Sequence, residues 1–181
     1  MQKNTCIRGC CNYMVLPYKN GYYTYTKNVN PDQKLRKAGS FIFDKQKNKI
    51  LLVQSRGQRW GPPKGSIKEN EDVVDCAIRE VKEETGLDIE EKNFLGSIVI
   101  KSKAQYYFTD MSETDVVLQT HIEDNDANGI GWFDVDCMNS LINDGLISIN
   151  QHCRLLIKKV FDKDIIFNKD SFAGRLDLNN E

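Results

Sequence analysis

The sequence lacks the features that mark membrane and secreted proteins. No apolar run approaches the roughly 18 consecutive residues of a membrane-spanning helix. The first residues, MQKNTCIRGCC, lack the apolar core of a signal peptide. No internal repeat and no linker interrupts the 181 residues, a length that suits one domain with a normal core. We therefore expect one soluble globular domain with no membrane partner.

Residues typical of metal centres are also sparse. His121 and His152 stand alone, without the spacing of metal ligands. Three of the six cysteines form the motif C-x3-C-C near the start, but no second pair matches it as a zinc site requires. In a chain without a secretion signal, six cysteines indicate reduced thiols in the cytosol or nucleus. We expect free thiols at Cys6, Cys10 and Cys11, and a cytoplasmic location.

The net charge of −1 is nearly balanced, but the charges are unevenly distributed. Residues 1–38 hold seven Lys or Arg against one acid, whereas the remainder holds 18 basic and 25 acidic residues. A basic arm beside an acidic site would suit a long polyanion held at two places. Five tyrosines lie within the arm, and lysine with tyrosine could grip and stack single-stranded nucleic acid. Equally, the arm could form an edge strand or a hairpin around Asn20-Gly21, a favourable type I′ turn.

Alternating strand and helix patterns follow the arm. Runs rich in β-branched and aromatic residues predict strands at Ala38–Phe43, Ile50–Gln54, Phe94–Lys101, Ala104–Thr109, Asp115–Ile122 and through Trp132-Phe133. Helical patterns follow at Met138–Ile142 and Gln151–Phe161, the latter with one apolar and one basic side. The pattern predicts the α/β class, a mixed sheet flanked by helices, with a polar tail that frays from Asn168.

The chain is organised around residues 65–87, GSIKENEDVVDCAIREVKEETGL. Asn70 is placed to cap the start of a helix and Gly86 to end it. At roughly 100° per residue, one side of this helix is apolar, with Val74, Ala77, Ile78 and Val81. On the other side we expect three carboxylates, those of Glu80, Glu83 and Glu84.

Three like charges at this spacing repel one another and cost helix stability. Hard divalent cations would compensate them, and Mg²⁺ or Mn²⁺ suits carboxylate oxygens best. The alternative is an ordinary solvated acidic face. A glycine, an arginine and a terminal glycine at fixed offsets from the glutamates favour the metal site.

These residues match the signature of Nudix hydrolases at every fixed position: glycine, five residues, glutamate, seven residues, then R-E-V-K-E-E-T-G-L. The resemblance implies the Nudix fold, a mixed β-sheet sandwiched between α-helices. It also implies hydrolysis of a diphosphate linked to another moiety, using divalent metals. Carried over, the metal ligands are Gly65 through its carbonyl, Glu80, Glu83 and Glu84, and Arg79 orients Glu71. We therefore expect a basic arm at 1–38, a Nudix domain at 39–167 and a polar tail at 168–181.

Outside the signature, the sequence resembles the catalytic domain of mRNA decapping enzymes, including those of large DNA viruses, so a viral protein would act in the host cytoplasm. Lys64, Asp75 and Cys76 carry this likeness, since the generic signature does not require them. The cellular decapping subunit has a large helical regulatory domain before its catalytic domain, whereas in this sequence we expect a short basic arm at that place. Pro63 instead resembles the P-P-K-G of dinucleoside tetraphosphate hydrolases, a competing activity. A catalytically idle binding module is a third interpretation.

Decapping would make capped RNA the partner and leave open whether a protein activator is needed. In decapping relatives a glutamate six residues before the late Trp-Phe serves as general base, and here that position is Asp126. Glu123, Asp124 or an ordinary loop aspartate are the alternatives. The expected catalytic residues are Glu80, Glu84, Asp126 and Arg79. The expected substrate contacts are Lys64, Trp60 (or core packing in its case), Lys27, Lys34, Arg36, Lys37, Arg154 and Lys158.

Overall fold

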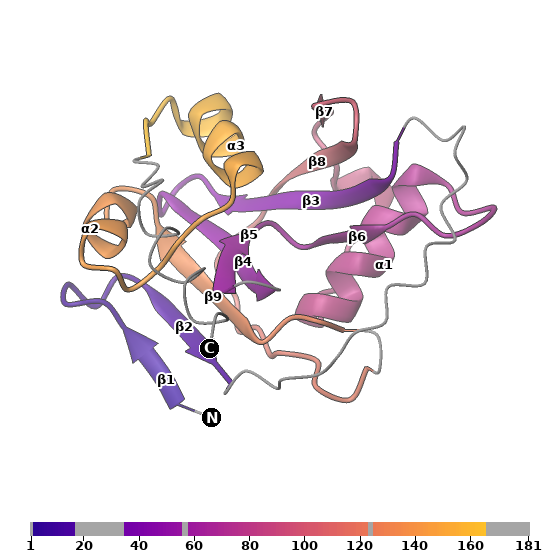
Figure 1. Cartoon of the computed structure of the whole chain (residues 1–181). Helices are drawn as coiled ribbons and strands as arrows, with labels where there is room; N and C mark the ends of the chain where they lie inside the picture. The colour runs from indigo at the N-terminus through magenta and orange to yellow at the C-terminus, as the bar shows by residue number, and fades with distance from the viewer. Residues whose placement is uncertain (1, 17–34, 56–57, 123–124, 166–181) are drawn as a thin grey trace, which may run out of the picture.

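The computed structural model describes residues 2–16, 35–55, 58–122 and 125–165. Within them, nine strands form one mixed sheet, and helices cover both of its faces (Figure 1). This confirms the α/β class and the sandwich of sheet between helices. Lys27 and Lys34 lie outside the described residues, as do Asn20-Gly21, Glu123, Asp124 and the tail from Asn168.

The strands run in the order β1-β2-β9-β4-β3-β8-β7, with β5 beside β4 and β6 beside β3. Only β3 and β8 pair in parallel among the described strands; the other pairs are antiparallel. The bounds are β1 Gln2–Thr5, β2 Asn12–Val15, β3 Lys37–Asp44, β4 Lys49–Ser55, β5 Arg59–Gly61, β6 Lys64–Ser66, β7 Ser97–Ile100, β8 Ala104–Asp110 and β9 Gly129–Asp134.

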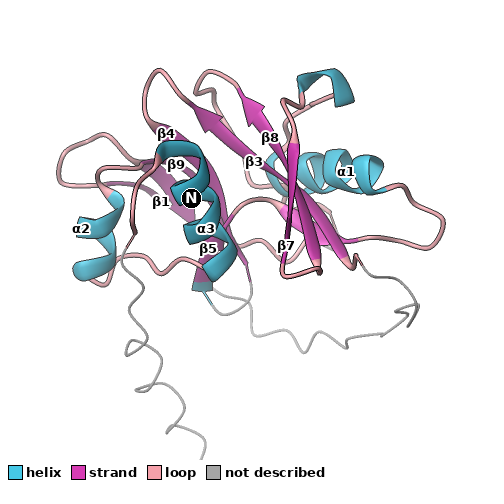
Figure 2. Ribbon diagram, turned by 90° about the horizontal axis from the view of Figure 1, so that it is seen from above, coloured by secondary structure: helices cyan, strands magenta, loops and turns pink. Residues whose placement is uncertain are grey.

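The helices are α1 Val73–Thr85, α2 Met138–Asn143 and α3 Gln151–Phe161, with a short 3₁₀ turn, η2, at Glu91–Asn93. Seen from above, α1 lies on one side of the sheet and α2 and α3 on the other (Figure 2). None of the helices in the described ranges has the length and apolarity to cross a membrane.

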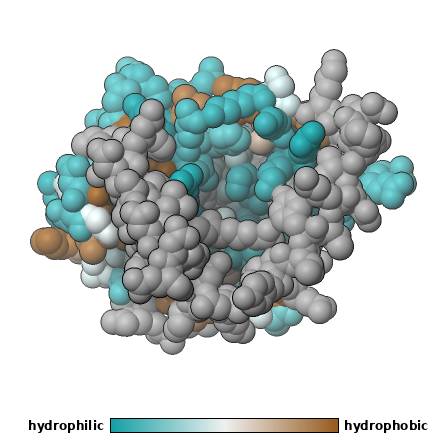
Figure 3. Space-filling model, in the orientation of Figure 1, coloured by the Kyte–Doolittle hydropathy of each residue, from teal (hydrophilic) through white to brown (hydrophobic). Residues whose placement is uncertain are grey.

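Strands β3 and β4 contribute side chains to the core on both faces of the sheet, because successive side chains of a strand point to opposite faces. Phe41, Phe43 and Leu52 pack on the side of α2 and α3, whereas Ile42 and Leu51 pack on the side of α1. On the face seen in Figure 3 the described surface is mainly hydrophilic, with scattered apolar patches. Burial on both faces explains the continuous apolar runs of β3 and β4.

The predicted strand at Asp115–Ile122 is wrong. The segment has no strand pairing in the structure. Val117 is 54% exposed and Leu118 only 2%. The extended segment thus packs one apolar side chain on the core although its backbone pairs with no strand. The Trp132 indole donates to the Thr114 carbonyl, which holds the loop against the sheet. The strand predicted at Phe94–Lys101 is shortened to β7, beginning just after Gly96.

The start of the chain joins the sheet as a hairpin. Strand β1 pairs with β2, and β2 pairs with β9 in the register Met14↔Ile130. The turn of this hairpin is at Cys6–Cys11, and the turn expected at Asn20-Gly21 lies outside the described residues. For residues 2–15 the edge-strand alternative is therefore the one observed. The division into arm, domain and tail stays a prediction, because 17–34 and 166–181 lie outside the described residues.

Candidate active site

Helix α1 begins and ends on local signals. Gly86 adopts the left-handed conformation (φ 76°), and its N–H donates to the Lys82 carbonyl, as predicted. The N-cap is Asp72, not Asn70, which itself has a positive φ of 60° and so lies in the preceding turn. A residue in that conformation cannot hold the extended backbone that an N-cap requires. The shift leaves Glu71 just before the helix.

Arg79 contacts the carboxylates of Glu71, Glu80 and Glu83, which together with Glu84 we call the acidic cluster. Its guanidinium binds Glu71 through two contacts, Nε to Oε1 at 2.6 Å and Nη2 to Oε2 at 2.9 Å. Nη1 also donates to Glu80 at 2.7 Å and to Glu83 at 2.9 Å. The hydrogen bond from Arg79, together with its charge, holds the pKa of Glu71 below its usual range. Arg79 thus offsets the repulsion among the carboxylates and orients Glu71, in line with the role the signature implies.

Glu84 lies on the buried face of α1, which corrects the prediction that all three glutamates share the solvent side. Seven residues at roughly 100° each return the helix nearly to the direction of Ala77, so Glu84 points at the sheet. It is 5% exposed, and its Oε2 accepts from the Lys64 backbone N–H at 2.8 Å. Burial raises the pKa of this carboxyl to about 8, although the charge of Lys64 opposes the shift.

Gly65 lies directly beneath the Glu80 carboxylate. A Cβ built at Gly65 would stand 2.0 Å from the carboxyl carbon of Glu80. Gly65 is held in β6, where it pairs with Ala38, so the backbone cannot easily withdraw. Burial raises the pKa of Glu80, and the charge of Arg79 opposes this. Any side chain at position 65 would therefore displace the Glu80 carboxylate from its present place.

We expect Gly65→Ala to lower turnover by about 10²-fold, because a displacement of about 1 Å at a reacting group has that cost. The added methyl forces the Glu80 carboxylate to move. Ser66→Ala, at an exposed side chain next to it, is the control and should retain activity. Turnover of both variants should be measured with saturating Mg²⁺. Equal turnover of the two would show that the contact between Gly65 and Glu80 is not needed.

The loop before β9 brings Asp126 to the cluster. The Asn125 side chain donates to the Glu83 carbonyl at 2.8 Å and to the Gln119 carbonyl at 3.0 Å. These bonds pin the loop to the C-terminal end of α1. From there the Asp126 charge acts on both Glu84 and Lys64. Asn125 was not singled out from the sequence, because a loop asparagine carries no signal of its partner.

Basic side chains flank the carboxylates. Burial lowers the pKa of Lys64, and the charge of Lys37 lowers it further. Burial also lowers the pKa of His152, with added contributions from Lys64, Lys101 and Lys37, so these groups lie close together. The Arg36 N–H donates to the Lys103 carbonyl, which places the turn between β7 and β8 beside the start of β3. Two predicted contacts, Lys64 and Lys37, thus lie close to Lys101. Arg36 adjoins Lys37 in sequence, and no sequence pattern singled out Lys101 or Lys103.

Two predicted substrate contacts lie elsewhere. Trp60 is 1% exposed and packs edge-on against Phe133 with ring centroids 4.8 Å apart, so it belongs to the core and offers no face to a base. Lys158 pairs with Asp162 at 2.8 Å and Asp164 at 3.2 Å near the C-terminal end of α3. Arg154 is half-buried on the same helix.

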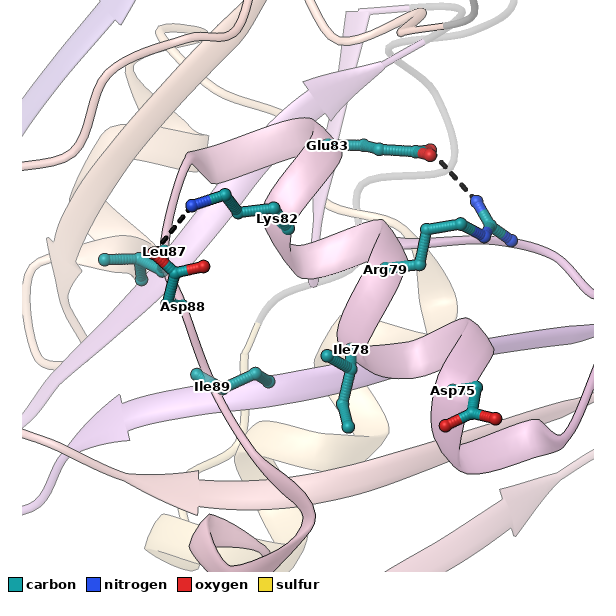
Figure 4. A pocket seen from close by; sticks show the side chains of 8 residues that line it. All are labelled: Asp75, Ile78, Arg79, Lys82, Glu83, Leu87, Asp88 and Ile89. Atoms are coloured by element: carbon teal, nitrogen blue, oxygen red, sulfur yellow. Dashed lines mark hydrogen bonds and ion pairs between the residues drawn. The ribbon is translucent and has the colours of Figure 1, made fainter.

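A pocket of about 370 Å³ opens on the outer side of α1 (Figure 4). Its apolar floor is formed by Ile78, Leu87 and Ile89, and Arg79 and Glu83 stand at one side. Glu80, Glu84 and Lys64 are not among its lining residues. The pocket therefore borders the acidic cluster at Glu83 and Arg79 but does not include Glu80 or Glu84.

The donor set fits divalent metal ions. Glu80, Glu83, Glu84 and the Gly65 carbonyl offer only oxygen ligands, which Mg²⁺ and Mn²⁺ prefer. The Glu80 carboxylate lies in the cradle left by the missing side chain of Gly65. Glu84 carries a carboxylate whose charge is disfavoured by burial, a cost that a bound cation would offset. The ligands implied by the signature are therefore chemically suitable.

Comparisons with known proteins point to one family. The family model of the NUDIX domain matches residues 33–145. Protein 111R of Invertebrate iridescent virus 3 is 32% identical over 133 residues, which is 73% of this chain and 77% of that protein. The m7GpppN-mRNA hydrolase of Saccharomyces cerevisiae is 36% identical over 101 residues, covering 53% of this chain and only 10% of the yeast protein.

Among solved structures, a MutT NUDIX hydrolase of Burkholderia pseudomallei superposes with a TM-score of 0.52 at 21% identity. The superposition covers 70% of this chain and 98% of the other, and it shows a shared fold. The full signature, the Arg79-centred glutamates and the matched domain lead to one conclusion: this chain belongs to the Nudix hydrolase family.

Proposed function

We propose that the protein hydrolyses the triphosphate bridge of the mRNA cap, releasing m7GDP and RNA with a 5′-monophosphate. The observation that carries the proposal is the 36% identity over 101 residues to the yeast m7GpppN-mRNA hydrolase. Lys64, Asp75 and Cys76, which the generic Nudix signature does not require, add to that likeness. The match covers 10% of the yeast protein, so the proposal concerns the cap reaction alone.

The placement of charges supports a polyphosphate substrate. Nudix enzymes use divalent metal ions, and we propose that the Gly65 carbonyl, Glu80, Glu83 and Glu84 hold Mg²⁺ or Mn²⁺ here. Such ions, when bound, polarise a phosphate and lower the pKa of the attacking water. Lys64 lies beside Glu84 and near Lys37, so it would neutralise phosphate oxygens next to the metal ligands.

The chain's own residues then divide the remaining work. Arg79 offsets the repulsion among Glu71, Glu80 and Glu83 and orients them through its four carboxylate contacts. Asp126, held by the Asn125 loop, would accept a proton from water. Arg36, Lys37, Lys101 and Lys103 form what we name the basic rim, which would contact the phosphates of the RNA that follows the cap.

One competing activity rests on a specific feature. The run Pro62-Pro63-Lys64-Gly65 resembles that of dinucleoside tetraphosphate hydrolases. The same carboxylates and lysine could act on diadenosine tetraphosphate. An idle binding module is disfavoured, because Glu80, Glu83 and Glu84 are all present, the first two bound by Arg79 and the third by the Lys64 backbone N–H.

The two activities separate in a direct comparison. Long capped RNA, free cap dinucleotide and diadenosine tetraphosphate are offered to the wild-type protein with the same Mg²⁺ or Mn²⁺ concentration. We expect kcat/KM to be highest for capped RNA, because only this substrate reaches the basic rim. Equal or higher kcat/KM for diadenosine tetraphosphate would favour the competing activity.

Binding of capped RNA should depend steeply on salt, whereas binding of the free cap dinucleotide should not. Substituting Lys27, Lys34, Arg36 and Lys37 together by Gln should reduce the slope of log K against log salt by up to about four. Hydrolysis of the short substrate should be spared. The measurement is RNA affinity by anisotropy over a salt series.

A matched control is available on α3. Lys158 is already paired with two aspartates, so Lys158→Gln should leave the salt slope almost unchanged, although the sequence predicted an RNA contact there. If the quadruple variant remains folded and its slope equals that of wild type, the N-terminal basic residues have only a structural role.

A further inference from the structure

We propose that Cys6, Cys10, Cys11 and Cys137 form a structural zinc site. The four sulfur atoms all lie within 4.8 Å of one another. The Cys6 and Cys10 sulfurs are 3.4 Å apart, and those of Cys10 and Cys11 are 4.0 Å apart. The C-x3-C-C motif lacked a partner in the sequence, and the fold supplies the missing ligand from 126 residues downstream.

The spacing fits tetrahedral coordination. With zinc–sulfur bonds of about 2.3 Å, the sulfurs at the corners of a tetrahedron stand about 3.8 Å apart. The observed separations of 3.4 Å and 4.0 Å lie on either side of that value. None of the six cysteines forms a disulfide. Four sulfur ligands in tetrahedral array are typical of zinc or iron, and no oxygen or imidazole ligand is in the group.

Two separate parts of the fold build the site. The hairpin turn between β1 and β2 supplies three sulfurs, and Gly9 closes it with a positive φ of 69° and an N–H donated to the Cys6 carbonyl. Cys137 lies between β9 and α2, where its N–H donates to the Asp134 carboxylate at 3.0 Å. The Asp134 N–H donates to the Cys11 sulfur at 3.3 Å, a contact that favours a thiolate.

Three of the four ligands are buried and Cys10 is half-buried, an enclosure typical of structural zinc sites. Cys6, Cys11 and Cys137 are 5%, 0% and 3% exposed, and they pack in the core on the side of α2 and α3. Helix α1, which carries the glutamates, lies on the opposite side of the sheet (Figure 2). The cysteine site therefore has no open position for a substrate and is separate from the proposed active site.

Zinc here would clamp the N-terminal hairpin to the body of the fold. Strands β1 and β2 have four residues each, and β1 lies at the sheet edge with one partner, so the hairpin has little support of its own. Just after β2, the Leu16 N–H donates to the Asn128 carbonyl at 2.7 Å. Loss of the clamp would thus also loosen the loop that carries Asp126.

Buried free cysteines are otherwise common, since a thiol behaves as a small apolar group. Cys76 and Cys153 illustrate that case: both are fully buried, and neither belongs to a group of potential metal ligands within the described residues. Cys153→Ser is therefore a matched control, because it removes one buried thiol without touching the four-cysteine group.

The test measures metal on the full chain purified under reducing conditions. We expect one zinc ion per chain by elemental analysis after loosely bound metal is removed. Exchange for Co²⁺ should produce intense thiolate-to-cobalt charge-transfer absorption, which carboxylate ligands at α1 do not give. Cys137→Ser should lose the zinc and the absorption band at least tenfold, whereas Cys153→Ser should keep both. Chelation should lower the melting temperature of wild type.

The absorption spectrum of the Co²⁺-substituted wild-type protein tests for sulfur ligands even if Cys137→Ser fails to fold. A folded, reduced protein that binds neither Zn²⁺ nor Co²⁺ through sulfur would overturn the proposal. So would iron in place of zinc, or a mass two hydrogens lower that reveals a disulfide within the group. Zinc retained by a folded Cys137→Ser variant would equally contradict the assigned ligand set.

Discussion

Glu84→Gln is expected to lower turnover by about 10²-fold or more, comparable to the loss of one electrostatic stabiliser in an active site. The substitution keeps the size of the side chain, and its amide oxygen can still accept from the Lys64 N–H. It removes the buried ionisable carboxyl group, which we propose as a metal ligand in its charged form. The measurement is kcat on capped RNA over a range of Mg²⁺ or Mn²⁺ up to saturation.

Glu69→Gln is the control, since it makes the same chemical change at an exposed carboxylate near Gly65. It should turn over like wild type. Glu84→Gln should remain folded, because it relieves a buried carboxylate of its desolvation cost. Turnover close to wild type at saturating metal would remove Glu84 from the ligand set.

Asp126→Asn is expected to lower kcat by roughly 10²–10⁴-fold, the usual contribution of a general base. Metal affinity should remain almost unchanged, because the α1 glutamates and the Gly65 carbonyl of β6, the proposed ligands, are intact. Measuring kcat and the metal dependence together separates a lost base from a lost metal ligand. Asn125→Ala tests the positioning of the loop: it should lower kcat less than Asp126→Asn, and its pH profile should keep the shape of wild type.

Variants of Glu123 and Asp124 show which outcome would contradict Asp126 as the general base. If Asp126→Asn retains most activity while Glu123→Gln or Asp124→Asn loses it, the count of six residues back from Trp132 is wrong. If all three variants stay active, no carboxylate of this loop removes the proton.

Local patterns predicted the site better than the sheet. The glycine at 86 placed the end of α1, because capping depends on a few adjacent residues, and the Nudix signature implied the pairing of Arg79 with Glu71. Counting seven residues on from Ala77 along the same helix would also have predicted that Glu84 is buried. Grouping the three glutamates by charge alone concealed it.

Features that depend on strand pairing could not be predicted from the chain. The turn carrying Lys101 and Lys103 reaches the site only because β8 pairs in parallel with β3, and Cys137 reaches Cys11 only because β2 pairs with β9. The β-branched segment at Asp115–Ile122 shows the opposite failure. The β-branched residues there favour a strand, but Leu118 is buried without any strand pairing of its segment.

Product identity from capped RNA tests the central claim most directly. A long RNA labelled in the phosphates of its cap is incubated with the wild-type protein and Mg²⁺ or Mn²⁺, with Glu84→Gln as the inactive reference. We predict release of labelled m7GDP together with RNA that carries a 5′-monophosphate. Intact capped RNA under conditions in which the same protein hydrolyses diadenosine tetraphosphate would contradict the assignment as a decapping enzyme.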